Sequence, residues 1–283
     1  MRANEPLFSA SSISEADARA LVTGIHAIWG LDFREHDLTA LRRRAGSFLA
    51  REALPDVARL LARLLVDPGC LDRLVRSFTS PVTAMFRDPG LYSALRELVV
   101  PVLRGLPYMR VWIAGCSTGE EAYSLAILLE EEGLYARSRI YATDVNASAL
   151  ERARQGVFPL HVMRGYTRNY LRAGGKADFS SYYATDEHHA ALAAGLRRNV
   201  VFARHDLTRD RSFHEFHLVL CRNVMIYFND ALRERVAALL GECVIPGGYL
   251  VLGNSESTRG SSIEPGFEPL HPRERLFRKR EAS

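Results

Sequence analysis

Lysine is almost missing from this chain of 283 residues: Lys176 and Lys279 are the only two, so nearly all of its basic residues are arginine. Cysteine is also scarce, and the four cysteines form no Cys-x-x-Cys pair, which predicts reduced thiols in a cytosolic protein. No run approaches the ~18 apolar residues of a membrane span. The N-terminal residues show no hydrophobic segment typical of a signal peptide. We therefore expect a cytoplasmic protein with no segment inserted in a membrane.

Several ligand-binding patterns are missing as well. The sequence has neither the Gly-x-Gly-x-x-Gly pattern of dinucleotide folds nor a Gly-Lys-Ser/Thr phosphate loop. His214, His217 and Cys221 are spaced along one predicted strand in a way that does not bring three ligands together, so no metal site is expected. A net charge of +4 and a pI of about 9.0 do not by themselves indicate nucleic-acid binding. The length and the 47% apolar residues allow one large domain and a small one.

The chain is organised around residues 110–129. Val111–Ala114 is a short apolar run that predicts a buried strand. Gly115 and Gly119 bracket a loop of small residues, and apolar positions from Ala122 onward follow helical spacing. A strand, a glycine turn and a helix open nucleotide-binding α/β domains, because glycine lets a ligand approach the backbone and the helix offers free N–H groups.

Acidic residues around this loop indicate the kind of ligand. Glu120 and Glu121 would repel a pyrophosphate and suit a cation, although they also complement a helix dipole. The next predicted strand, residues 140–143, ends at Asp144, where such folds carry a ribose-binding carboxylate; a cap for the following helix is the alternative. Together these features favour an adenosyl ligand without phosphates, and S-adenosylmethionine (SAM) has a sulfonium and no phosphate.

Three motifs resemble the CheR family of chemotaxis protein-glutamate O-methyltransferases. Residues 114–124, Ala-Gly-Cys-Ser-Thr-Gly-Glu-Glu-Ala-Tyr-Ser, resemble its SAM loop. Residues 221–228, Cys-Arg-Asn-Val-Met-Ile-Tyr-Phe, resemble its second signature, and residues 83–89, Thr-Ala-Met-Phe-Arg-Asp-Pro, its third. The resemblance covers roughly residues 12–279, with the motifs in the family's order.

The resemblance implies an α/β, Rossmann-like SAM-dependent methyltransferase domain with an inserted small β-subdomain, preceded by an all-α N-terminal domain. Apolar helical faces support a helical domain over residues 1–80. We expect a linker at 81–90 and the methyltransferase domain at 91–283. The insertion is expected at about 157–198, where the aromatic run 179–183 resembles a strand.

The resemblance also implies roles for individual residues. Arg87 would meet the methionyl carboxylate of SAM, Tyr227 would lie beside the transferring methyl, and Arg222 would position the substrate. Pro81 stands where the family often has an asparagine, so one contact is expected to be missing. Asp206 also replaces a common asparagine and can bond the adenine or its amine. The implied cofactor contacts are Thr83, Arg87, Gly115, Gly119, Glu121, Asp144, Asp206, Leu207, Asn223 and Val224.

The N-terminal region also suggests a partner. Eight arginines lie between positions 42 and 76. In the family a basic helix of this domain is proposed to meet acidic receptor helices, while a solvated helix face is the alternative. Some members bind a receptor peptide through a Gly-x-Gly loop of the β-subdomain, and residues 172–176 here have no clear Gly-x-Gly, which argues against such tethering. The matching basic patch would be Arg42, Arg43, Arg44 and Arg51.

The expected function is methyl transfer from SAM to glutamate side-chain carboxylates of a chemoreceptor-like protein, giving methyl esters and S-adenosylhomocysteine (SAH). A carboxylate is ionised at neutral pH, so no general base is needed. One alternative is a non-catalytic SAM-binding signalling module. Another is a nucleic-acid methyltransferase, whose Asn/Asp-Pro-Pro-Tyr/Phe motif differs from residues 223–226, Asn-Val-Met-Ile. We expect a monomer; the acceptor protein, its glutamates and its pathway are open.

Overall fold

The computed structural model describes residues 12–79 and 83–281. The expected N-terminal tail and the start of the predicted linker, with Pro81, lie outside these residues. The chain divides into two compact units: the N-terminal region with Tyr227–Arg233, and Val82–Ile226 with Glu234–Ser283. Within the described residues, no helix is long and apolar enough to span a membrane.

The first unit is helical, as predicted, because each helix has a side-chain cap or an apolar face. Ser14, Asp37 and Asp56 each accept a hydrogen bond from a backbone N–H three residues later, at 3.0, 2.7 and 2.7 Å. The buried faces, which include Leu21, Phe48 and Leu60, pack together as the core of this unit. Its helices are α1 (Glu15–Trp29), α2 (Leu38–Arg51), α3 (Val57–Val66) and α4 (Pro68–Thr79).

Residues Tyr227–Arg233 belong to this helical unit, although from the sequence they are expected in the methyltransferase domain at 91–283. The N–H of Asp37 donates to the carbonyl of Tyr227 at 2.8 Å. The rings of His36 and Phe228 lie 5.1 Å apart. Burial, with the positive charge of Arg44, lowers the pKa of His36 to about 4, so this histidine is neutral at pH 7.

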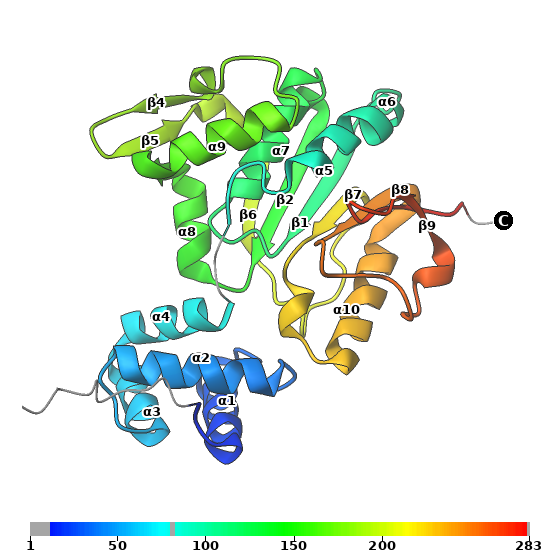
Figure 1. Ribbon diagram of the computed structural model, residues 1–283. Coiled ribbons are helices and arrows are strands. Elements are labelled where there is room, and N and C mark those ends of the chain that lie inside the picture. The colour runs from blue at the N-terminus through cyan, green and yellow to red at the C-terminus, as the bar shows by residue number, and fades with distance from the viewer. Residues whose placement is uncertain (1–11, 80–82, 282–283) are drawn as a thin grey trace, which may run out of the picture. The chain divides into compact units, whose positions relative to one another are not determined.

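The second unit contains a seven-stranded sheet in the order β6-β2-β1-β7-β8-β10-β9. The first five strands are parallel and the last two antiparallel, which gives the mixed sheet of the predicted α/β domain (Figure 1). The predicted strands at 111–114 and 140–143 are both present. The strands are β1 (Met109–Ala114), β2 (Ser138–Asp144), β6 (Val200–Arg204), β7 (Phe216–Cys221), β8 (Val244–Leu252), β9 (Phe267–His271) and β10 (Leu276–Lys279).

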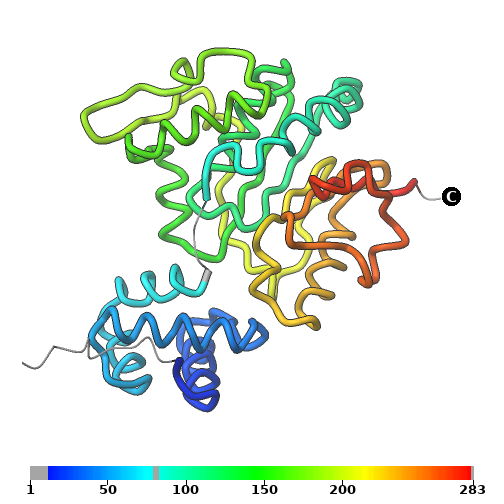
Figure 2. Tube along the Cα trace, in the orientation of Figure 1, coloured from blue at the N-terminus to red at the C-terminus, as the bar shows by residue number. Residues whose placement is uncertain are grey.

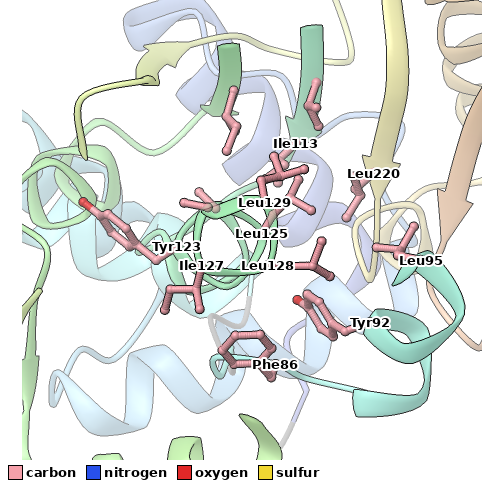
Figure 3. Close-up of a cluster of buried hydrophobic side chains, with 14 of the residues drawn as sticks. Phe86, Tyr92, Leu95, Ile113, Tyr123, Leu125, Ile127, Leu128, Leu129 and Leu220 are labelled. Carbon is pink, nitrogen blue, oxygen red and sulfur yellow. The ribbon is translucent and has the colours of Figure 1, made fainter. Parts of the chain in front are cut away.

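Helix α7 (Glu120–Glu131) is the central helix of the second unit, and its residues 122–129 are all buried. Figure 3 shows why: Ile113 and Leu220 of the sheet lie on one side of the helix, and Phe86 and Tyr92 on the other. A helix that is apolar all round is enclosed on all sides. The other helices are α5 (Pro89–Ala94), the π-helical η1 (Leu95–Val99), α6 (Val100–Leu103), the 3-10 turn η2 (Tyr135–Arg137), α8 (Ala147–Gln155), the 3-10 turns η4 (Ala194–Arg197), η5 (Met225–Tyr227) and η6 (Glu264–Gly266), and α10 (Asp230–Cys243).

The order of the strands reverses beside β1. From β1 the chain moves to β2 and β6 on one side, and then returns to β7 on the other. Ala114 and Cys221, the last residues of β1 and β7, are register partners. The loops that follow them therefore begin side by side at the carboxyl edge of the sheet, where open α/β sheets bind ligands.

The predicted insertion is a three-stranded antiparallel sheet in the order β3-β5-β4, next to helix α9. Figure 2 shows its path, in green, between α8 and β6. The expected strand over 179–183 is wrong: Phe179–Tyr182 forms the 3-10 turn η3, because Phe179 turns into the core against Phe86 and Tyr170. The elements are β3 (Val157–Pro159), α9 (Leu160–Arg172), β4 (Tyr183–Thr185) and β5 (His189–Leu192).

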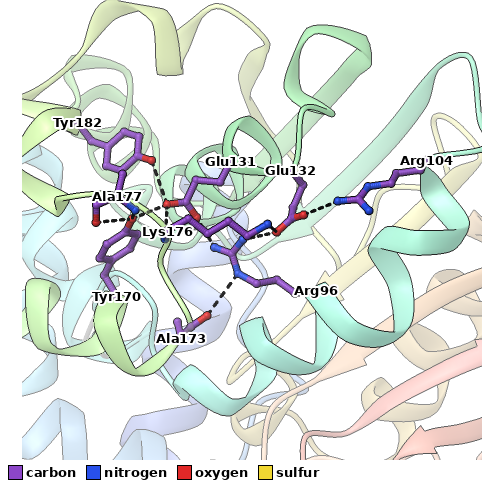
Figure 4. Close-up of polar contacts among 9 residues, drawn as sticks. All are labelled: Arg96, Arg104, Glu131, Glu132, Tyr170, Ala173, Lys176, Ala177 and Tyr182. Carbon is purple, nitrogen blue, oxygen red and sulfur yellow. Dashed lines mark hydrogen bonds and ion pairs between the residues drawn. The ribbon is translucent and has the colours of Figure 1, made fainter.

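A network of charges joins this insertion to the C-terminal end of α7 (Figure 4). Oε1 of Glu131 accepts hydrogen bonds from the hydroxyls of Tyr170 and Tyr182 and from the N–H of Lys176. Its Oε2 is paired with Arg96, which also reaches Glu132 at 2.5 Å. Burial would raise the pKa of Glu131, but these donors lower it below its usual value.

We predict that Glu131→Ala lowers the free energy of unfolding by about 1–3 kcal/mol, because it removes one of the two carboxylates paired with the buried Arg96 and the shared acceptor of three other donors. Urea titration followed by circular dichroism measures this difference. Because the folded-state pKa is lowered, the stabilisation is present above the unfolded-state pKa and is lost as pH falls through the folded-state pKa. The gap between wild type and variant should therefore narrow in acid.

The control for this prediction is Glu130→Ala, at the exposed neighbouring position on the same helix. That change should alter stability by less than about 0.5 kcal/mol. Equal losses in the two variants would mean that the network does not stabilise the fold.

Candidate functional site

The loop after β1 comes close to the loop after β7. Gly115 has a φ of +77°, and a Cβ placed on it would lie 2.3 Å from Cγ2 of Val224. Gly119, with a φ of +92°, begins α7, and a Cβ there would lie 3.0 Å from Cβ of Ala153. Both predicted glycines are therefore required by the backbone conformation and by the space around them.

Asp144, the last residue of β2, contacts this loop. Its Oδ2 accepts a hydrogen bond from the N–H of Ser117 at 2.9 Å, and its Oδ1 from the N–H of Asn146 at 2.8 Å. The cap for the following helix is the side chain of Asn146, which accepts from the N–H of Ala149 at 3.1 Å. Burial raises the pKa of Asp144, against the effect of these N–H donors. Each carboxylate oxygen has a second lone pair, so Asp144 can still accept from a ribose.

Residues 83–88 lie beside the start of α7. The N–H of Phe86 donates to Oγ of Ser124 at 2.8 Å, and the ring of Phe86 is fully buried. Thr83 and Arg87 are partly exposed. The segment thus presents polar side chains from a backbone that is anchored in the core.

Arg222 joins this segment to the loop after β1. Its guanidinium pairs with Glu121 and with Asp88, both at 2.5 Å, and its side chain is only 3% exposed. Burial would lower the pKa of Arg222, but the Glu121 carboxylate raises it above its usual value. These contacts assign Arg222 to holding three chain segments together; the expected direct contact with a substrate has no support in its exposure.

Unusual backbone conformations gather in the same motifs. Among the described residues, six non-glycine residues have a positive φ, and four of them are Phe86, Asp88, Ser117 and Asn223. Such conformations are unfavourable for residues with a side chain and concentrate at functional sites. This distribution marks the three motifs as one site independently of any resemblance.

Asp206 follows β6 at the same edge of the sheet. Its Oδ1 accepts from the N–H of Thr208 at 2.9 Å and from its hydroxyl at 2.6 Å, while its own N–H donates to Asp210 at 2.8 Å. Leu207 is partly exposed. One carboxylate oxygen of Asp206 therefore shapes the turn.

These residues fit SAM better than a phosphate-bearing nucleotide. At Gly115 the missing side chain lets Val224 of the neighbouring loop lie directly against the backbone. Asp144 supplies a carboxylate at the end of β2, and the buried Arg222 is already paired with two acids. These motifs contain no lysine.

Comparisons with known proteins agree with this geometry. Residues 81–269 match the CheR methyltransferase, SAM binding domain. A putative methyltransferase of Pseudomonas putida, Cher3, is 45% identical over 94% of this chain and 97% of its own length. A chemotaxis protein methyltransferase of Listeria innocua is 31% identical over 80% of this chain and 84% of its own. The chain belongs to the CheR methyltransferase family. Its predicted fold and its cofactor, SAM, are thereby confirmed.

Some contacts of this CheR site were not anticipated. Glu120 is 5% exposed and accepts hydrogen bonds from Thr118 at 2.6 Å and from Tyr166 at 3.3 Å; burial raises its pKa. Asp88 is the second partner of Arg222. Tyr166 and Asp88 are distant in sequence from the residues they contact, so no local pattern indicates these pairs.

The four arginines expected to dock a receptor differ in their contacts within the first unit. Arg42 donates to the carbonyl of Ile13 at 2.9 Å. Arg44 donates to the carbonyl of Phe78, and its guanidinium lies 4.5 Å from the ring centre of Tyr227. Arg43 and Arg51 are exposed. Three of the four therefore have contacts inside the unit, since the guanidinium of Arg51 lies 5.2 Å from the ring centre of Phe48, while Arg43 is exposed.

We predict that Gly115→Ala weakens SAH binding by about tenfold or more and destabilises the fold by about 1–3 kcal/mol. The new Cβ would collide with Val224 and would occupy a left-handed backbone conformation. Calorimetric titration with SAH measures the affinity.

Gly133→Ala is the matched control, since its φ is +68° and nothing lies within 4 Å of the added Cβ. It should lose stability but keep SAH affinity. Adding Val224→Ala to Gly115→Ala should recover part of the lost stability; no recovery would show that the clash with Val224 is not the cause.

Proposed function

We propose that this protein transfers the methyl group of SAM to glutamate side-chain carboxylates of a chemoreceptor-like protein. The observation that carries the proposal is the buried Glu121–Arg222–Asp88 cluster. It fixes a cation at the site while neutralising it with two acids. A carboxylate nucleophile paired with a free guanidinium would be stabilised and less reactive.

The chemistry requires alignment and no general base. Glutamate is ionised at neutral pH, and the three motifs contain no histidine. SAM supplies a methyl group activated by a positively charged sulfur. The protein holds the carboxylate in line with that methyl and excludes water, and such positioning contributes roughly 7–11 kcal/mol to catalysis.

We assign the individual roles in the proposal from the family resemblance. Arg87 meets the methionyl carboxylate, and Asp144 accepts from the ribose hydroxyls. Asn223 and Val224 line the cofactor, with the remaining implied contacts around them. Tyr227 lies beside the transferring methyl. Arg222 acts through Asp88 and Glu121, and so positions the segment that carries Arg87.

Two alternative functions have less support. A nucleic-acid methyltransferase of the amino type carries Asn/Asp-Pro-Pro-Tyr/Phe after this strand, whereas residues 223–226 are Asn-Val-Met-Ile. A non-catalytic SAM-binding module would not need Arg87 in a strained segment fixed by a buried ion pair.

We predict that receptor-containing membranes, incubated with the protein and methyl-labelled SAM, gain label that mild base releases as methanol. A carboxyl ester behaves in this way, and an N-methyl group does not. Base-stable label on protein or nucleic acid would contradict the proposed acceptor. SAH binding without any transfer would support the signalling module.

The same assay tests Arg87. Arg87→Ala should lower turnover by about 10²-fold or more, while thermal unfolding stays close to that of the wild type. Arg110→Ala, outside the three motifs, is the control. Unchanged turnover in Arg87→Ala would remove Arg87 from the mechanism.

The exposed arginines test the docking surface. We expect Arg43→Glu with Arg51→Glu to raise the KM for receptor several-fold and to leave SAH affinity unchanged, because charge complementarity guides docking. Arg42 and Arg44 are unsuitable for this test since they donate hydrogen bonds to backbone carbonyls within the unit. An unchanged KM in the double variant would mean that these two side chains form only a solvated face.

A further inference from the structure

A buried carboxylate lies beneath the loop after β7. Glu256, four residues beyond the end of β8, is 6% exposed. Its Oε2 accepts hydrogen bonds from the N–H groups of Asn223 at 2.9 Å and Gly253 at 2.7 Å. Its Oε1 accepts from those of Val224 at 3.0 Å and Met225 at 2.8 Å. One side chain thus satisfies four backbone donors.

This arrangement explains the conformation of the loop. Three consecutive N–H groups, from Asn223 to Met225, converge on Glu256, and a backbone turned in this way forms an anion-binding concavity. Asn223 has a φ of +59°, which is unfavourable for a residue with a side chain. Hydrogen bonds to an ionised acceptor are stronger than neutral ones, so Glu256 can hold the loop in this conformation.

The turn that carries Glu256 is tightly packed against the loop after β7. The N–H of Glu256 donates to the carbonyl of Gly253 at 2.8 Å, which folds the chain back beneath the loop. A Cβ on Gly253 would lie 2.6 Å from Oε2 of Glu256 and 2.8 Å from the nitrogen of Asn223. Since Cys221 and Leu252 are register partners, the turn and the loop leave the sheet side by side.

We propose that Glu256 is a positioning residue for the cofactor. It fixes residues 223–225 so that Val224 stays against Gly115 and Asn223 keeps its orientation. This inference rests on the proposed assignment of Asn223 and Val224 to the cofactor site. It adds a residue from outside the three motifs.

The decisive variant is Glu256→Gln, which keeps the size of the side chain. Its amide has one acceptor oxygen and an NH2 group that would face N–H donors. The matched control is Glu131→Gln. Glu131 is also a carboxylate with little exposed side-chain surface that accepts a backbone N–H, but it lies at the C-terminal end of α7. Ser255→Ala, at the exposed neighbouring position, controls for the turn itself.

We expect Glu256→Gln to weaken SAH binding by about tenfold or more, whereas Glu131→Gln changes it less than twofold for a similar loss of stability. Calorimetric titration measures the affinity, and urea unfolding measures the stability. Amide hydrogen exchange should rise at residues 223–225 in Glu256→Gln and stay unchanged there in Glu131→Gln. Equal loss of affinity in both variants would reduce Glu256 to a general stabiliser and overturn the proposal.

Gly253→Ala provides a second route should Glu256→Gln fail to fold. It leaves every charge in place and crowds the carboxylate, so it should also raise exchange at 223–225 and weaken SAH binding. Wild-type exchange and affinity in Gly253→Ala would overturn the proposal.

Asn223→Ala separates this inference from the site on which it rests. If it weakens SAH binding and Glu256→Gln does not, the site is right and Glu256 is not its positioning residue. If Asn223→Ala leaves binding unchanged, the assignment of the loop to the cofactor fails, and the inference fails with it. Both readouts use SAH alone, so an acceptor other than glutamate would affect neither.

Discussion

The close approach of Val224 to the backbone of Gly115 is the constraint on which the site depends. It exists because β1 and β7 are neighbours whose carboxyl ends lie at one edge of the sheet. Every other feature of the site fixes one side of this contact. Asp144 holds Ser117 of the first loop, and Glu256 holds the backbone of the second.

The same region shows why arginine suits this protein. Arg222 pairs with two carboxylates from separate segments, and Arg96 pairs with two adjacent carboxylates at the opposite end of α7. A planar guanidinium can address two acids at once and remains charged when buried, whereas a lysine ammonium is a single point of charge. The arginine content is thus put to structural use at both ends of the central helix.

Local patterns in the sequence were enough to predict part of the fold. The apolar run of β1, the glycines that follow it and the periodicity of α7 each depend on neighbours in the chain, and they are present as expected. The strand predicted at 179–183 was wrong because a tertiary contact decided it: Phe179 turns into the aromatic core. The assignment of Tyr227–Arg233 to the helical unit likewise depends on partners nearly two hundred positions away.

The same distinction between local sequence patterns and tertiary contacts applies to the candidate site. Its glycines and Asp144 could be placed from the sequence, since their roles come from a strand–turn–helix unit. The partners of Arg222 could not, because Asp88, Glu121 and Arg222 come from three separate segments. Glu256 was missed for the same reason, and nothing in its neighbourhood in the sequence indicates four converging N–H groups.

The network at the end of α7 limits how this chain can vary. Two acids at a helix C-terminus oppose the helix dipole, so Glu131 and Glu132 depend on their donors. Lys176 of the inserted segment is paired with Glu132, and the hydroxyl of Tyr170 donates to Glu131. The insertion is therefore not an independent cassette. A chimera that exchanges residues 157–198 with those of a distant relative removes these contacts and leaves the two acids to Arg96 and Arg104.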